Sequence, residues 1–80
     1  MRVNEAIKVR IFELCNERKI TVNKLATISG ITQSTLNNIV NRPNNSTTVS
    51  TIKKICDGLE ITSQDFFNSD IFFNLEQEVK

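Results

Sequence analysis

Two short segments separated by one glycine constrain this chain more than any other feature. Residues 20–40 have the sequence ITVNKLATISGITQSTLNNIV. The spacing of their apolar residues predicts one helix over 22–28 and a second over 33–40. Gly30 lies between them, at a position where helices commonly end in the left-handed backbone that glycine tolerates. We therefore predict two helices joined by a tight turn, which is a helix-turn-helix.

The rest of the chain also has helical periodicity, and no alternating pattern predicts a strand. We predict helices over 3–18 and 49–59, and a short fifth helix that begins after Thr62. Thr62 and Asp65 have the spacing of a capping box at the start of that helix. The predicted fold class is therefore all-α, a compact domain of five helices.

Eighty residues correspond to a single domain with one modest core. We assign residues 1–80 to that domain, with the helix-turn-helix at about 21–40 and an apolar, then acidic, tail at 68–80. The residues expected in the core recur at helical spacing: Ile7, Ile11, Leu14, Cys15, Leu25, Ala26, Leu36, Ile39, Val40, Ile52, Ile55, Cys56 and Leu59.

The outer side of the first predicted helix is expected to be ordinary surface. Val9 and Phe12 lie off its apolar stripe, so they either widen the buried face or form a satellite patch. Its charged residues are interpreted as a solvated face: Arg10, Glu13, Glu17 and Lys19.

Charge is distributed unevenly along the chain, although the net charge is only +1. Residues 1–54 hold nine Lys or Arg and three acids, whereas residues 55–80 hold one Lys and six acids. Between residues 18 and 56 there are six cations and no Asp or Glu. This asymmetry indicates contact with nucleic acid at one end, the alternative being a dipolar surface without a function.

Residues 11–67 resemble the Cro/C1-type (XRE) helix-turn-helix domain, which is found in phage repressors, including lambda repressor, and in bacterial regulators. The segments LATISGIT, STLNNIV and TIKKICDGLEITSQDFF carry the resemblance. The spacing of apolar residues from Leu25 to Phe66 fits the five-helix pattern of that family. The resemblance implies a DNA-binding transcriptional regulator, most simply a repressor, encoded by a bacterium or a phage.

Four positions depart from the pattern of that family. Val22 stands where the family often has a Gln that grips a phosphate or a base. Cys15 and Val40 stand where the family often has a buried Arg–Glu pair, and replacing both charges avoids stranding one of them. Arg42 stands where the family often has Gly.

The resemblance implies that the helix over 33–40 enters the major groove, with its N-terminal residues foremost. Gln and Asn amides can bond bidentately to adenine, and Thr or Ser can touch the thymine methyl. An ordinary solvated helix would use Glu and Lys, which are better helix formers. For Asn37 and Thr35, simple capping and solvation is an equal alternative. The expected base-reading residues are Thr32, Gln33, Ser34 and Asn38, with Asn37 beside them.

Polar and basic residues around the helix-turn-helix are candidates to bind DNA phosphates, and backbone N–H groups at helix starts can add to this. For Lys53 and Lys54 a solvated charge explains the sequence at least as well. The phosphate-binding candidates are Thr21, Asn23, Lys24, Asn41, Arg42, Asn44 and Asn45.

The tail has two interpretations. Its apolar residues either fold back onto the first helix and complete the core, or they form a two-fold dimer interface. One recognition helix reads too few base pairs to find one site in a genome, so we expect a homodimer, in the free protein or only on DNA. Its expected target is an inverted repeat rich in A·T pairs. The candidate pairing residues are Phe67, Ile71, Phe72, Phe73 and Leu75.

Several other classes of function are disfavoured. The chain has no His, and Cys15 and Cys56 are too far apart to suggest a metal site, so we expect buried reduced thiols and no metal or cofactor. Without a nucleophile–base pair or a phosphate loop we expect neither an enzyme nor a small-molecule ligand. No leader or membrane-length run is present, so we expect a cytoplasmic, nucleoid-associated protein without a membrane partner. The alternative function is a protein-interaction module of the same fold, an antitoxin or antirepressor, and Val22 favours it.

Overall fold

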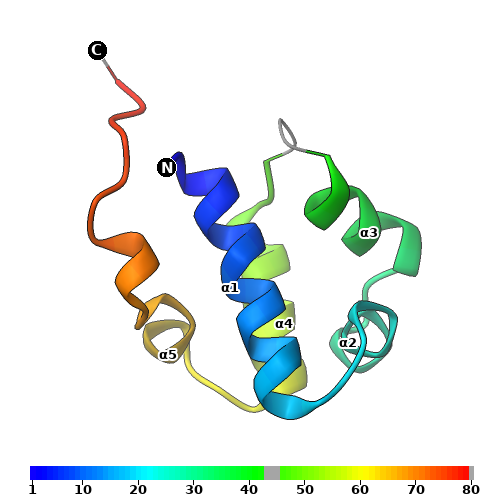
Figure 1. Cartoon of the computed structure of the whole chain (residues 1–80). Helices are drawn as coiled ribbons and strands as arrows, with labels where there is room; N and C mark the ends of the chain where they lie inside the picture. The colour runs from blue at the N-terminus through cyan, green and yellow to red at the C-terminus, as the bar shows by residue number, and fades with distance from the viewer. Residues whose placement is uncertain (43–45, 80) are drawn as a thin grey trace.

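The computed structural model describes residues 1–42 and 46–79, and within them all regular structure is helical. The helices of Figure 1 are α1 (Val3–Arg18), α2 (Val22–Ser29), α3 (Gln33–Asn41), α4 (Val49–Leu59) and α5 (Ser63–Phe67), followed by a 3₁₀ turn, η1 (Asp70–Phe72). The predicted all-α, five-helix fold is therefore confirmed. The predicted bounds of α1 and α4 are also confirmed, while α2 and α3 each extend one residue further than expected.

The helices surround a single core. In Figure 1, α2 and α3 lie on one side of α1, and α5 with the tail lies on the other. Helix α2 packs against α3 and α4, α5 packs against α4, and η1 packs against α1. The side chains that are almost completely buried come from all five helices: Ile11, Leu25, Leu36, Ile55, Cys56, Leu59 and Phe66. Every residue that was expected in the core is buried there.

Threonine side chains begin four of the helices. The hydroxyl oxygens of Thr21, Thr32, Thr48 and Thr62 each accept a hydrogen bond from the backbone N–H three residues later, at 3.0–3.2 Å. At α5 the backbone N–H of Thr62 also donates to Asp65, which completes the predicted capping box. These bonds satisfy N–H groups that have no partner inside the helix.

The turn between α2 and α3 is made at Gly30. Its φ is +69°, in the left-handed region, as the sequence predicts. The N–H groups of Gly30 and Ile31 donate to the carbonyls of Thr27 and Ala26, and Ile31 packs against the core. A Cβ at Gly30 would meet nothing within 4 Å, so the constraint on this residue is its backbone conformation. The turn directs α3 steeply away from α2 (Figure 1).

Gly58 has a different role, which the sequence does not reveal. A Cβ at this position would lie 2.6 Å from Oγ of Ser29 and 2.8 Å from the carbonyl oxygen of Ile28. The end of α2 therefore presses directly on the backbone of α4. Because α2 and α4 meet this closely, α4 fixes the position of the whole helix-turn-helix.

Arg10 corrects one expectation. The sequence suggests a solvated side chain, but only 8% of Arg10 is exposed. Its guanidinium donates from Nε to the carbonyl of Phe66 at 2.6 Å and from Nη2 to that of Asp65 at 2.7 Å, and Nη1 pairs with Glu13. These carbonyls belong to α5; that of Asp65 also accepts from the backbone N–H of Asn68, and that of Phe66 lies in the last turn, where helices leave carbonyls unpaired. Arg10 thus fastens α5 to α1.

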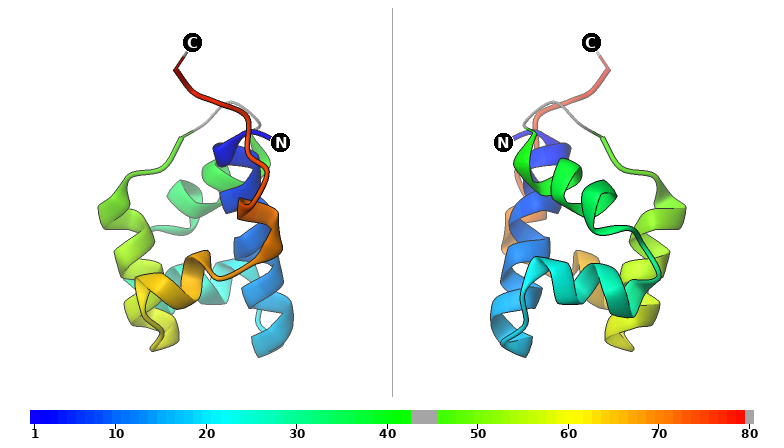
Figure 2. Two further views of the ribbon diagram at one scale, coloured as in Figure 1. Left: turned by 90° about the vertical axis from the view of Figure 1, so that its left-hand side faces the viewer. Right: turned by 90° about the vertical axis from the view of Figure 1, so that its right-hand side faces the viewer.

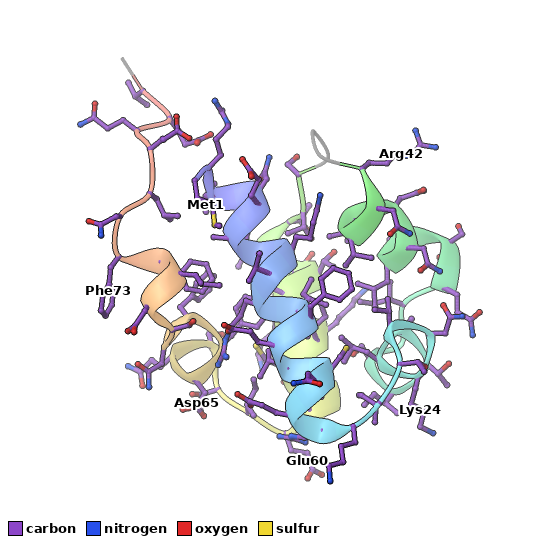
Figure 3. The ribbon with its side chains drawn as sticks, in the orientation of Figure 1. Met1, Lys24, Arg42, Glu60, Asp65 and Phe73 are labelled. Carbon is purple, nitrogen blue, oxygen red and sulfur yellow. The ribbon has the colours of Figure 1, made fainter. Side chains whose placement is uncertain are left out.

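The tail folds back along α1, as the first interpretation predicts. The N–H of Glu76 donates to the carbonyl of Met1, and the Met1 amine pairs with the Glu76 carboxylate. Phe72 packs against the core, and its ring lies 5.0 Å from that of Phe67. Phe73 is different, because 74% of it remains exposed. The tail therefore completes the core through Phe72. It leaves Phe73 in solvent, at the outer edge of the molecule (Figure 3).

Candidate nucleic-acid interface

Helices α2 and α3 together form one face of the molecule. The right-hand view of Figure 2 shows α3 lying above α2 on the side facing the viewer. Leu36, Ile39 and Val40 are buried and hold α3 against the core. The remaining side of α3 is therefore directed outward. Four of the expected base-reading residues are exposed there, and Asn37 is half-buried: Thr32, Gln33, Ser34, Asn37 and Asn38.

Thr32 already uses its hydroxyl within the protein. The oxygen accepts from the N–H of Thr35 and the hydroxyl donates to Oγ1 of Thr35 at 2.7 Å. Thr32 therefore fixes the start of α3, and its hydroxyl is committed to that cap. Gln33 and Ser34 follow it in the first turn, where the positive end of the helix dipole favours a negatively charged partner.

Asn37 links the two helices of this face. Its Nδ2 donates to Oδ1 of Asn23 at 3.0 Å, across a sequence separation of 14 residues. The sequence placed these residues in two different sets, base-reading and phosphate-binding. No periodicity or spacing would have revealed the bond, because it depends on how α2 and α3 cross.

The phosphate-binding candidates lie around the same face. Thr21, Asn23, Lys24, Asn41 and Arg42 are all exposed, whereas Asn44 and Asn45 lie outside the described residues. In Figure 3, Lys24 and Arg42 occupy the same side of the molecule, and Asp65 and Phe73 the opposite side. Among the described residues neither Lys24 nor Arg42 is in a salt bridge with an acid.

Two other cations of the acid-free segment are engaged elsewhere. Arg18 donates to the carbonyl of Leu59 at 2.7 Å, close to the end of α4. Lys53 pairs with Asp57 one turn further along α4, and this hydrogen bond and the carboxylate charge raise the pKa of Lys53. The positive charge near the helix-turn-helix is therefore concentrated on fewer residues than the sequence suggests.

A groove runs between α3 and the start of α4, with a volume of about 310 Å³. Most of its lining residues are Ser or Thr, and the buried Oγ1 atom of Thr47 forms no hydrogen bond with the described residues. The sequence predicts turn and cap chemistry in this region but no groove. Its lining residues are Thr35, Asn38, Ile39, Ser46, Thr47, Thr48 and Thr51.

No group of three or more potential metal ligands is found among the residues that the structure describes. Cys15 and Cys56 are free and buried, and burial raises the pKa of both thiols. No described helix is both long and apolar enough to cross a bilayer.

Comparison with known proteins identifies the family. A sequence profile described as the Cro/C1-type HTH DNA-binding domain matches residues 10–69. The chain therefore belongs to the Cro/C1-type helix-turn-helix DNA-binding family, and this membership implies binding to double-stranded DNA. The crystal structure of prophage Lp1 protein 11 is similar, with 30% identity and a TM-score of 0.79 over 94% of this chain and 100% of that one. A search of curated proteins finds no match.

Proposed function

We propose that this protein is a sequence-specific transcriptional repressor that reads the major groove of DNA with α3. The observation that carries the proposal is the exposed side of α3, which presents hydroxyls and amides and no carboxylate. Amide and hydroxyl groups match the donor and acceptor pattern of base edges. The similarity to a prophage protein supports an origin in a phage or a bacterial genome.

In this proposal, base reading and phosphate binding are divided between residues. Gln33, Ser34 and Asn38 contact base edges, and Thr32 adds its methyl group beside them. The phosphate contacts come from Thr21, Asn23, Lys24, Asn41 and Arg42, with Asn44 and Asn45 as further candidates. The whole chain acts as one DNA-binding domain.

The preferred target is an inverted repeat rich in A·T pairs, bound by a homodimer. Amide side chains favour adenine. A two-fold dimer doubles the number of base pairs read, with half-site centres about 34–36 Å apart. Pairing is proposed to involve the surface around Phe73, which lies on the side of the molecule opposite Lys24 and Arg42 (Figure 3).

Selection of bound DNA from a random pool tests the base-reading assignment. On the selected site, Gln33→Ala and Asn38→Ala should each weaken binding by about 1–3 kcal/mol, and by much less on random DNA. Gln64→Ala is the matched control, because Gln64 is exposed on α5, on the other side of α1. A G·C-rich selected site to which both variants bind normally would contradict the assignment.

Titration with salt tests the phosphate assignment. Lys24→Ala and Arg42→Ala should weaken binding to every sequence alike, and each should reduce the slope of log affinity against log salt by about one. Arg2→Ala serves as the control, since Arg2 already pairs with Glu78 of the tail. A change in base preference in either variant would assign that residue to base reading instead.

The same titration separates the alternative function. An antitoxin or antirepressor that kept the fold without binding DNA would give no salt-dependent shift with any DNA fragment. In that case the α2–α3 face would be a protein-binding surface, and the selection from the random pool would return no enriched sequence.

A further inference from the structure

The bond between Asn37 and Asn23 determines what each amide can offer to a ligand. An Asn side chain has one acceptor oxygen and one NH₂ group with two donors. The Oδ1 of Asn23 already accepts from Asn37 at 3.0 Å. The bond turns Oδ1 toward Asn37, and because the two ends of an amide diverge, the NH₂ group of Asn23 is directed away from Asn37, toward a new partner.

An NH₂ group is what a DNA phosphate requires. Phosphodiester oxygens only accept hydrogen bonds, so an amide that turned its oxygen toward them would be repelled. Asn23 is exposed in the first turn of α2, next to Lys24. The side chain of its neighbour Val22 is apolar and packs against the core, so that side chain offers no donor here.

Asn37 differs from the other polar residues of α3 in its surroundings. It is half-buried where α3 meets α2, whereas Gln33, Ser34 and Asn38 are exposed. A side chain held between two helices is better placed to orient a neighbour than to adapt to a base edge.

We propose that Asn37 is a positioning residue, which holds the Asn23 amide with its NH₂ directed toward a DNA phosphate. This proposal rests on the proposed DNA binding and refines it, because it moves Asn37 from base reading to the support of a phosphate contact. The bond also couples the two helices, so that the position of α3 in the groove and the phosphate contact of α2 are set together.

A double-mutant cycle on DNA binding tests the proposal. Asn23→Ala and Asn37→Ala should each weaken binding by about three- to tenfold, the value of one hydrogen bond. The loss should be equal on the selected site and on random DNA, and selection with Asn37→Ala should return the same sequence as the unmodified protein. The double variant should bind no more weakly than Asn23→Ala alone, because both changes remove one contact.

A second experiment replaces the amide donor of residue 23 with an ammonium group, which should make the phosphate contact independent of Asn37. The ammonium group of Asn23→Lys is a flexible point charge with donors in every direction, so it needs no orientation by a neighbour. In the Asn23→Lys background, Asn37→Ala should therefore leave the affinity unchanged. A residue that only stabilised the fold would still weaken binding in this background.

The outcomes distinguish this proposal from the proposed function. Losses that add in the double variant, or an altered selected sequence with Asn37→Ala, would overturn it and assign Asn37 to base reading. Normal binding by Asn37→Ala would overturn it as well. Failure of the unmodified protein to bind DNA would instead contradict the proposed function. Asn16→Ala, an exposed substitution on α1, controls for loss of an amide, and thermal unfolding verifies that each variant is folded.

Discussion

Replacing Arg10 with methionine should lower the free energy of unfolding by about 2–3 kcal/mol. This is a large share of the total stability of a small domain. The methionine can fill much of the same space, but it cannot donate to the carbonyls of Asp65 and Phe66. Those carbonyls would lose charge-assisted hydrogen bonds in a poorly hydrated position. Urea unfolding measures the loss directly.

Arg2→Met is the matched control for this prediction. Arg2 forms an ion pair with Glu78, but both side chains are about half exposed, so the pair should contribute about 0–1 kcal/mol. Amide hydrogen exchange provides a second measurement, because loss of Arg10 should release α5 and the tail before the rest of the fold. Equal destabilisation by the two variants would show that the buried hydrogen bonds of Arg10 contribute no more to the free energy of unfolding than an exposed ion pair does.

Arg10 also shows why part of the fold could not be predicted. Local signals sufficed for the helices, because apolar spacing, threonine caps and Gly30 act within a few residues. The role of Arg10 depends on carbonyls 55 and 56 positions away. Beside Glu13 and Glu17, such an arginine has the local pattern of a solvated helix face, and only the return of α5 buries it.

The same distinction applies to close packing and to backbone strain. From the sequence alone, Gly58 only lowers the helix propensity of α4. Its function, which is to leave room for the end of α2, is visible only when α2 is packed against α4. Lys19 and Glu60 take left-handed conformations at the ends of α1 and α4, with φ of 56° and 58°, although neither is a glycine. Their N–H groups still bond to the preceding helix turns, so the requirement to end these helices outweighs the backbone preference.

The candidate site was predictable in composition more than in geometry. The spacing of the apolar residues identified the exposed residues of α3, because Leu36, Ile39 and Val40 determine which side of the helix faces the core. The engagement of Arg18 by Leu59 and of Asn37 by Asn23 was not predictable, since both bonds join segments that meet only in the folded chain.

Phe73→Ser should abolish cooperative binding to the inverted repeat while leaving stability nearly unchanged. With 74% of its surface exposed, Phe73 contributes little to the core of one subunit. A dimer interface built on this residue links two half-site contacts, and the loss of that linkage should reduce affinity for the full site by about a hundredfold or more. Binding to an isolated half-site should stay as it was. Gel shifts on full and half sites measure both quantities.

Phe72→Ser is the neighbouring substitution that separates pairing from folding. Phe72 packs against the core and contacts the rings of Phe66 and Phe67, so its removal should destabilise the fold by about 2–3 kcal/mol, less than for a fully buried ring. Its effect on DNA binding should therefore follow the folded fraction and disappear at low temperature, whereas that of Phe73→Ser should persist. If Phe73→Ser binds the full site as cooperatively as the unmodified protein, the dimer interface lies elsewhere on the molecule.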